Sequence, residues 1–336
     1  MIRVWISAFL AIAGILWLAA AGAYAAQKWN DENLTADELY ARYGQASEQI
    51  SATDAVRYLL SLVNEERRSR DLQELRWDAM AASAAQEHTN EMAKFRYLSH
   101  LNLLGEKPNM RYNRHGGTDQ VSENVFYRGS TVKLYLTRKI IKDIHERWMS
   151  SPAHCRNLLA PGHNSVGLGF TLSWDGSRSV LTAAEEFVDD YGDYSALPYE
   201  AKEQEMLDLS GEFFNRQTKL LYVLIGREPF PEKQSAKELN ANLNGYSLPK
   251  PFVALMPKSN AYLHAVKDTP TFYPIYYQPS HGRFSLRFSF GGLFDQLNQS
   301  GISAAFRPGL YYVMVWAAEP EGKPFIVSTQ VIRVED

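Results

Sequence analysis

The sequence predicts an α+β protein, with a mixed N-terminal domain over residues 53–194 and an all-β domain over residues 221–336. Three observations predict this class. Apolar residues recur at helical spacing in two segments, residues 53–70 and 77–95. Two β-favouring runs flank a turn at residues 174–177, as in a hairpin. In the C-terminal third, aromatic and β-branched runs separated by Pro and Gly are typical of an immunoglobulin-like β-sandwich.

The first 25 residues have the features of a signal peptide. One Arg precedes a long apolar run, and Ala23-Tyr24-Ala25 fits the small-x-small cleavage pattern. The apolar run also approaches the roughly 20 residues that span a bilayer, so an N-terminal membrane anchor is the alternative. Both interpretations place the rest of the chain outside the cytoplasm, secreted or periplasmic. Residues 26–52 are polar and are predicted to be a spacer.

Capping signals set the expected helix ends. In the spacer, Thr35 to Glu38 is a capping-box pattern and Gly44 is a natural stop. The amphipathic helix that follows is expected to begin at Thr53 or Asp54. Another helix is predicted over about residues 131–150. Residues 105–121 are polar and are predicted to be a loop, and residues 195–220 are predicted to be a charged helical connector between the domains.

Charge and cysteine content exclude two classes of protein. The 35 Lys and Arg residues are spread along the chain and are outnumbered by 38 Asp and Glu, so no basic surface for nucleic acid is expected. The single Cys cannot form an intrachain disulfide, so stability must come from core packing. Nothing in the sequence determines the oligomeric state.

The stretch RWMSSPAHCRNLL, residues 147–159, contains a histidine beside the only cysteine. Adjacent residues of a helix point about 100° apart, so His154 is poorly placed as a base for Cys155, and a buried, inert thiol is expected. Ser151 is a good N-cap and Pro152 suits the first helical position. His154 then lies in the first turn, where the helix dipole disfavours the imidazolium form.

Two motifs of hydrolytic enzymes are missing. The chain has no G-x-S-x-G sequence, which excludes the nucleophile elbow of α/β-hydrolases. His145-Glu146 begins like the H-E-x-x-H zinc motif, but Met149 stands where the second histidine is needed. Neither mechanism is therefore expected from local sequence.

Six motifs in order along the chain are Asn64-Glu65-Glu66-Arg67, Leu75-Arg76-Trp77-Asp78, His88, Ser99-His100, Ser122-Glu123-Asn124 and Trp148-Met149-Ser150-Ser151-Pro152-Ala153-His154. Together they resemble the bacterial branch of the CAP superfamily (cysteine-rich secretory proteins, antigen five and pathogenesis-related proteins), also called the SCP domain. The resemblance runs over about residues 54–192 and leaves the C-terminal third uncovered. It implies an α-β-α sandwich with a central cleft.

The resemblance also implies a cluster of histidine and glutamate side chains in that cleft, which holds a metal ion in some members. By motif, His100 and His154 are the two histidines and Glu123 is the first glutamate. The second glutamate of the eukaryotic branch falls at Ser151, which leaves a thinner ligand set. Two imidazoles and one carboxylate are the ligands of an open zinc site. The alternative is a metal-free hydrogen-bonded network in which Glu123 holds the imidazoles.

The remaining motif residues are assigned supporting roles. Ser122 stands where the family has Gly, and the glutamate beside it is retained. His88 lies on an apolar stripe, so it is expected to be either a core histidine whose hydrogen bonds are satisfied or a residue of the cleft. The residues expected to be scaffold that fixes the cleft walls are Asn64, Arg67, Trp77, Asn124, Trp148 and Asn157.

The sequence is compatible with three functions, and it does not decide whether the protein is an enzyme. The first is a non-enzymatic binding role toward an envelope component, a lipid-like ligand or another protein. It is favoured because no second carboxylate occupies the motif position of a general base. The second is a zinc hydrolase whose metal-bound water attacks an amide or ester. The third is protein or polysaccharide binding by the β-sandwich, with the CAP domain as scaffold.

Overall fold

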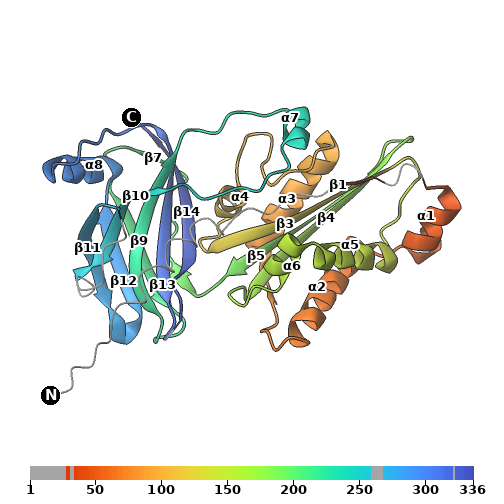
Figure 1. Cartoon of the computed structure of the whole chain (residues 1–336), viewed down its shortest axis with the longest axis horizontal. Helices are drawn as coiled ribbons and strands as arrows, with labels where there is room; N and C mark the ends of the chain where they lie inside the picture. Colours follow the sequence, from red (N-terminus) through yellow and green to blue (C-terminus); the bar gives the residue numbers. More distant parts are fainter. Residues whose placement is uncertain (1–27, 31–33, 259–267, 321) are drawn as a thin grey trace, which may run out of the picture.

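The computed structural model describes residues 28–30, 34–258, 268–320 and 322–336 (Figure 1). The predicted signal peptide or anchor, residues 1–25, lies outside the described residues. Within the described ranges, no helix combines the length and apolar character needed to cross a membrane. The described chain forms two sheets, one in each half of the molecule.

The N-terminal sheet has an antiparallel centre and short parallel edges. The hairpin predicted around residues 174–177 joins two of its three long strands, residues 165–174 and 179–189, and the backbone N–H of Asp175 donates to the carbonyl of Arg178 across the turn. The strand order is β1-β3-β5-β4-β2. The strands are β1 (Lys28–Asn30), β2 (Arg76–Trp77), β3 (Gln120–Ser130), β4 (Ser165–Trp174) and β5 (Ser179–Asp189).

Helices cover both faces of this sheet, which gives the α-β-α sandwich that the family resemblance implied (Figure 1). Successive residues of β3 point to opposite faces. Val125 and Tyr127 pack with α3, whereas Phe126 packs with α2 and α5. The helices are α1 (Ala36–Tyr43), α2 (Ala52–Arg68), α3 (Ala79–Phe95), α4 (Pro108–Arg114), α5 (Arg138–Ser150) and α6 (Pro152–Leu158).

Three sequence expectations for this half need correction. The capping box of Thr35 and Glu38 is present, but α1 is not part of a spacer, because Leu39 and Tyr43 are buried in the core shared with α2 and α5. The N-cap of α2 is Ser51, whose Oγ accepts from Asp54, rather than Thr53 or Asp54. The predicted loop 105–121 contains α4, whose first residue is a proline that needs no hydrogen-bond partner.

The C-terminal half is strand-rich, as predicted, but its strands form one continuous sheet. Apolar side chains from β6 to β14 on one face share a single core with α8, so the sheet curls around that core. Two of its pairings, β10 with β11 and β14 with β7, are parallel, unlike those of an immunoglobulin sandwich. The strand order is β6-β8-β12-β11-β10-β9-β13-β14-β7. The elements are β6 (Gly192–Tyr194), β7 (Glu200–Lys202), β8 (Leu207–Phe213), β9 (Lys219–Glu228), α7 (Ala236–Ala241), β10 (Pro251–Pro257), β11 (Thr271–Gln278), β12 (Arg283–Phe288), α8 (Phe290–Gln299), β13 (Gly309–Ala318) and β14 (Phe325–Glu335).

The helical connector predicted over residues 195–220 is wrong. This segment contains β7, β8 and the first residues of β9. Leu207 and Leu209 are buried and alternate with the exposed Asp208 and Ser210, which is the period of a strand with one face in the core. Charged residues on the outer face gave the segment its helix-like composition. Because β6 already belongs to the second sheet, the C-terminal half begins by Gly192.

Candidate functional site

Of the three side chains predicted for the cleft, His100 and Glu123 are in direct contact, and His154 is near enough to His100 for an electrostatic effect. His100 lies in the loop after α3, Glu123 lies on β3, and His154 lies in the first turn of α6. Nδ1 of His100 donates a hydrogen bond to Oε1 of Glu123 over 2.8 Å. The charge of His100 also acts on the imidazole of His154. We refer to these three residues as the His–Glu cluster.

The His–Glu cluster is buried and does not line an open cleft. The exposed fractions of His100, Glu123 and His154 are 1%, 0% and 0%. The solvent-reachable hollow expected from the sequence is therefore closed at these residues in the structure. Any molecule that contacts these three side chains must first displace the residues that bury them.

A buried arginine, which the sequence analysis missed, completes the environment of Glu123. Arg111 lies on α4, and its Nη2 donates to the second carboxylate oxygen of Glu123. Its Nη1 donates to the backbone carbonyls of His100 and Glu106 at 2.8 and 3.1 Å. Glu186 on β5 lies 3.7 Å from Nη2 of Arg111. Both oxygens of Glu123 are thus engaged by protein donors.

The ion pair fixes the charge states around Glu123. Burial alone would raise the pKa of the Glu123 carboxyl, but the Arg111 guanidinium, with His88 and His100, outweighs burial and holds the pKa at about 2. Burial and the neighbouring Glu123 charge raise the pKa of Glu186 well above its ordinary value, against the opposing effect of Arg111. At neutral pH, Glu123 is therefore an ionised partner of Arg111, and Glu186 holds its proton to a higher pH than an ordinary carboxyl does.

Two of the other buried histidines, His88 and His154, differ in how well their hydrogen-bonding groups are satisfied. Nε2 of His88 donates to the carbonyl of Ser99 over 2.7 Å, which supports the core interpretation of this residue. Burial, with a smaller effect of His100, lowers the pKa of His154 to about 4. Within the part of the chain that the structure describes, neither ring nitrogen of His154 has a hydrogen-bond partner. His154 is therefore a neutral, buried imidazole with unused polar atoms.

An amide network joins β3, β5 and α6 beside the His–Glu cluster. Nδ2 of Asn157 donates to Oδ1 of Asn124 over 3.1 Å, and Nδ2 of Asn124 donates to Glu185 and to the carbonyl of His154. Oγ of Ser122 donates to Oδ1 of Asn157 over 2.7 Å. Asn124 and Asn157 thus hold α6, and with it His154, against the sheet.

Three of the four other predicted scaffold residues are buried. Asn64 binds both backbone groups of Leu75, and Arg67 donates to the carbonyls of Leu158, Ala160 and His163 between 2.8 and 3.0 Å. Trp148 is fully buried on α5. Trp77 lies instead on the edge strand β2 and is 45% exposed, so it is not part of this buried framework.

The junction around residue 151 agrees only in part with expectation. Ser151 is the N-cap of α6 and Pro152 is its first residue, but the Ser151 side chain makes no capping hydrogen bond. Cys155 is half-buried rather than buried. It follows His154 by one position on α6, so its side chain points away from the core that covers His154. Among the described residues, the Ser151 side chain makes no hydrogen bond to any residue of the His–Glu cluster.

Comparisons with known proteins decide the family of this half of the chain. The sequence model of the cysteine-rich secretory protein family, CAP, matches residues 60–187. The chain contains a CAP domain. No curated protein matches the sequence.

Solved structures with similar folds come from several bacteria. An outer surface protein of Borrelia burgdorferi is 17% identical, with a TM-score of 0.34 over 42% of this chain and 97% of that chain. An extracellular protein containing an SCP domain from Bacillus anthracis is 21% identical, with a TM-score of 0.32 over 47% of this chain and 44% of that chain. A cysteine-rich secretory protein of Staphylococcus aureus is 13% identical, with a TM-score of 0.28 over 44% and 40%. These similarities are too remote to indicate a ligand.

The CAP domain does not fit the zinc ion that the family resemblance implied. A zinc ligand needs a carboxylate oxygen free to coordinate, but Arg111 and His100 hold both oxygens of Glu123. A guanidinium beside the carboxylate also repels a cation. Among the described residues, no group of three or more His, Cys, Asp or Glu side chains is arranged to hold a metal ion. We therefore derive no chemistry through zinc.

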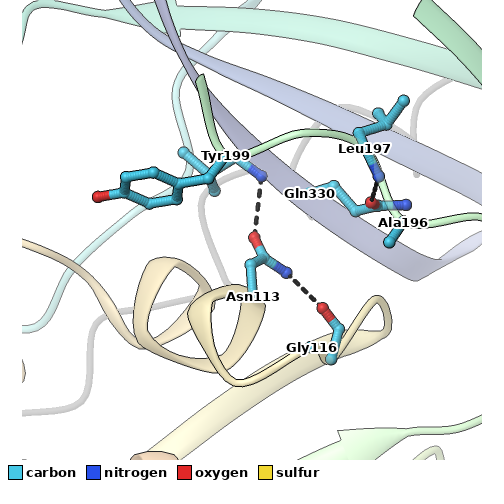
Figure 2. A pocket seen from close by; sticks show the side chains of 8 residues that line it. Asn113, Gly116, Ala196, Leu197, Tyr199 and Gln330 are labelled. Carbon is cyan, nitrogen blue, oxygen red and sulfur yellow. Dashed lines mark hydrogen bonds between the residues drawn. The ribbon is translucent and has the colours of Figure 1, made fainter. Parts of the chain in front are cut away.

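Two pockets of the described chain lie away from the His–Glu cluster. One, of about 40 Å³, lies where α4 of the CAP domain meets β14, and it has room for only a few water molecules. Figure 2 shows Asn113 there between the two halves: its amide donates to the carbonyl of Gly117 and accepts from the backbone N–H of Val331. The other is a surface groove between α2 and α5 beside His145. Neither pocket contains a residue of the cluster.

The buried carboxyl of Glu185 makes the stability of the CAP domain depend on pH. Burial raises its pKa to about 8, against a hydrogen bond from Asn124, whereas the unfolded chain has a value near 4.5. Between pH 4.5 and 8 the folded state keeps a proton that the unfolded state has lost, so this group makes stability fall as pH rises, by up to about 1.4 kcal/mol per pH unit. The Glu185→Gln variant cannot ionise. In urea unfolding, we expect it to be more stable relative to wild type at pH 8 than at pH 5.

The control for this measurement is Glu200→Gln, which changes an exposed carboxyl on β7. Its difference from wild type is expected to stay constant between pH 5 and 8. The same constancy for Glu185→Gln would contradict a proton held by Glu185 in the folded state.

Proposed function

We propose that this protein acts outside the cytoplasm as a non-enzymatic binding protein, and that the His–Glu cluster is the centre of its ligand site. The ligand classes considered are an envelope component, a lipid-like molecule or another protein. The observation that carries the proposal is the buried His154 imidazole, whose two nitrogens have no hydrogen-bond partner among the described residues.

An unsatisfied buried imidazole is costly, and it has a simple functional explanation. Leaving a buried polar group without a partner costs about 1–3 kcal/mol, so such groups are rare in folded proteins. A neutral imidazole offers one donor and one acceptor. A ligand that carries both kinds of group beside His154 would satisfy the ring without any change in its protonation. Because His154, unlike the equally unsatisfied His145, also belongs to the predicted His–Glu cluster, its unused capacity supports a binding site rather than a purely structural role.

The state of Glu123 supports binding over hydrolysis. A general base works best with a pKa near the operating pH, whereas the pKa of Glu123 is held at about 2 by Arg111. Burial and the Glu123 charge raise the pKa of Glu186, the other carboxyl beside Arg111, well above its ordinary value. The cluster thus contains hydrogen-bonding groups for a ligand, and its own carboxylate, Glu123, is a poor base for attack by water.

The test compares two alanine variants of buried histidines. His154→Ala removes the imidazole from the cluster, and His145→Ala removes an equally unsatisfied, 4% exposed imidazole from α5. Neither change breaks a hydrogen bond within the described chain, so both variants should fold. Phospholipid vesicles, purified envelope polysaccharide and an immobilised aromatic peptide are assayed separately, and we expect His154→Ala to retain the ligand that wild type binds at least tenfold less than wild type does. His145→Ala should bind like wild type.

Equal retention by His154→Ala and wild type would contradict a ligand site at the cluster. In that case binding by the C-terminal sheet, with the CAP domain as scaffold, would become the better explanation. The exposed Tyr273 and Tyr276 of β11 would then be the next residues to change.

A further inference from the structure

One long connection of the C-terminal half extends to the CAP domain and returns. Residues 229–250 leave the end of β9, form α7 beside the CAP helices and come back to begin β10 (Figure 1). We call residues 229–250 the strap. Only two strap residues, Leu239 and Tyr246, are buried, and both are buried against the CAP domain.

The first half of the strap is fixed to the loop that carries His100. The backbone N–H of Gln234 donates to the carbonyl of Leu103 over 2.9 Å. The Asn240 side chain donates to the carbonyl of Arg96 over 3.0 Å and accepts from the backbone N–H of Leu98 over 3.1 Å. These hydrogen bonds attach the strap to loop residues that precede and follow His100 in the sequence.

The strap then places an aromatic ring on the His–Glu cluster. The ring of Tyr246 lies 5.5 Å from the ring of His100, centroid to centroid, and Tyr246 is 9% exposed. Nζ of Lys107 donates to the carbonyl of Ser247 over 2.9 Å, which fixes the residue after this tyrosine. Tyr246 therefore covers His100 on the side facing the C-terminal half, and this cover contributes to the closure of the expected cleft.

Few buried side chains hold the strap on the CAP domain. Its helix, α7, has six residues, and helices of that length are not stable without packing. Its burial on the CAP domain rests mainly on Leu239 and Tyr246, while the sheet that carries it has a separate core. Segments with few buried contacts open at lower free energy than the domain unfolds.

We propose that the strap is a built-in occupant of the CAP ligand site, and that the natural ligand is a peptide segment with an aromatic side chain that takes the place of Tyr246. This inference rests on the proposed function, because it names the partner of the same site. The strap engages the site with backbone-type hydrogen bonds, one apolar side chain and one aromatic ring. A ligand that displaces it must offer the same groups, and another polypeptide does so.

The first test measures how well Tyr246 shields the His–Glu cluster from solvent in the full-length protein. Tyr246→Ala is compared with Tyr276→Ala, which removes a tyrosine that is 62% exposed on β11. The probe is diethylpyrocarbonate, which modifies neutral, accessible imidazoles, followed by peptide mass spectrometry. We expect His100 and His154 to react at least tenfold faster in Tyr246→Ala than in wild type, and at wild-type rate in Tyr276→Ala.

Two histidines serve as internal standards in this test. His281 is exposed and should react at one rate in all samples. His88, a residue of α3 that is 1% exposed, should stay unreactive as long as the CAP domain is folded. Unchanged reactivity of His100 in a Tyr246→Ala protein, and in the Leu239→Ala, Tyr246→Ala double variant, would overturn the inference.

The second test supplies the strap as a separate molecule. A synthetic peptide of residues 231–248 is expected to bind the Tyr246→Ala protein at least tenfold more tightly than wild type, whose own strap competes. The same peptide with alanine for Tyr246 should lose at least tenfold in affinity. Equal binding of both peptides would overturn the inference. If the tyrosine peptide binds selectively but His154→Ala retains envelope ligands like wild type, the proposed function fails while the internal cover stands.

Discussion

Replacement of Arg111 by alanine is expected to lower the free energy of unfolding of the CAP domain by about 3–5 kcal/mol. Arg111 and Glu123 are both buried, with exposed fractions of 1% and 0%. Removing the guanidinium leaves the Glu123 carboxylate without its strongest partner in a medium that solvates charge poorly. The loss is measured by urea unfolding, and hydrogen exchange of the β3 amides locates it in the CAP domain.

The matched control is Arg283→Ala, which removes an arginine from the exposed pair with Glu212 on the C-terminal sheet. Water and salt screen that pair, so little change in stability is expected. The double variant Arg111→Ala, Glu123→Ala should lose less than the sum of its single variants, because it leaves no unpaired charge. A loss from Arg111→Ala as small as that from Arg283→Ala would contradict the buried ion pair.

The His–Glu cluster could be predicted in part because its residues belong to short local motifs. His100 and Glu123 lie in motifs with a recognisable residue order, and their hydrogen bond follows once the sheet forms. Arg111 could not be found in this way. It lies in a polar stretch whose helical start is marked only by Pro108, and its burial depends on packing between α4 and β3 rather than on any pattern in the sequence.

The covering of the His–Glu cluster by Tyr246 could not be predicted from the sequence either. Tyr246 follows His100 by almost half the chain, in a segment that resembles a polar linker. Its position over the imidazole depends on how the two halves pack, which periodicity and composition do not encode. For the C-terminal half, composition was enough to predict strands, whereas the order of those strands in one curled sheet depends on long-range pairing. The same limitation explains why the charged outer face of β8 suggested a helix.

The second large loss of stability is expected from a substitution at the contact between α3 and β4. Gly167→Ala is expected to destabilise the CAP domain by about 3 kcal/mol or to prevent its folding, because a methyl group has no space there. An added Cβ at Gly167 would lie 1.9 Å from the backbone nitrogen of Ala82 and 2.2 Å from the carbonyl carbon of Ala81. These are backbone atoms of α3, so no side-chain rotation can relieve the clash. Thermal unfolding of the purified variant measures the loss.

Gly162→Ala is the control for the same chemical change. The nearest atom to its added Cβ is Oδ1 of Asp189 at 3.8 Å, an ordinary contact, so its stability should stay within about 0.5 kcal/mol of wild type. Gly169, where a Cβ would lie 2.6 Å from the backbone of Ala85, should behave like Gly167. The two glycines are two residues apart and face the same helix, so together they let α3 approach β4 closely. Wild-type stability of Gly167→Ala would mean that α3 lies farther from the sheet than the structure places it.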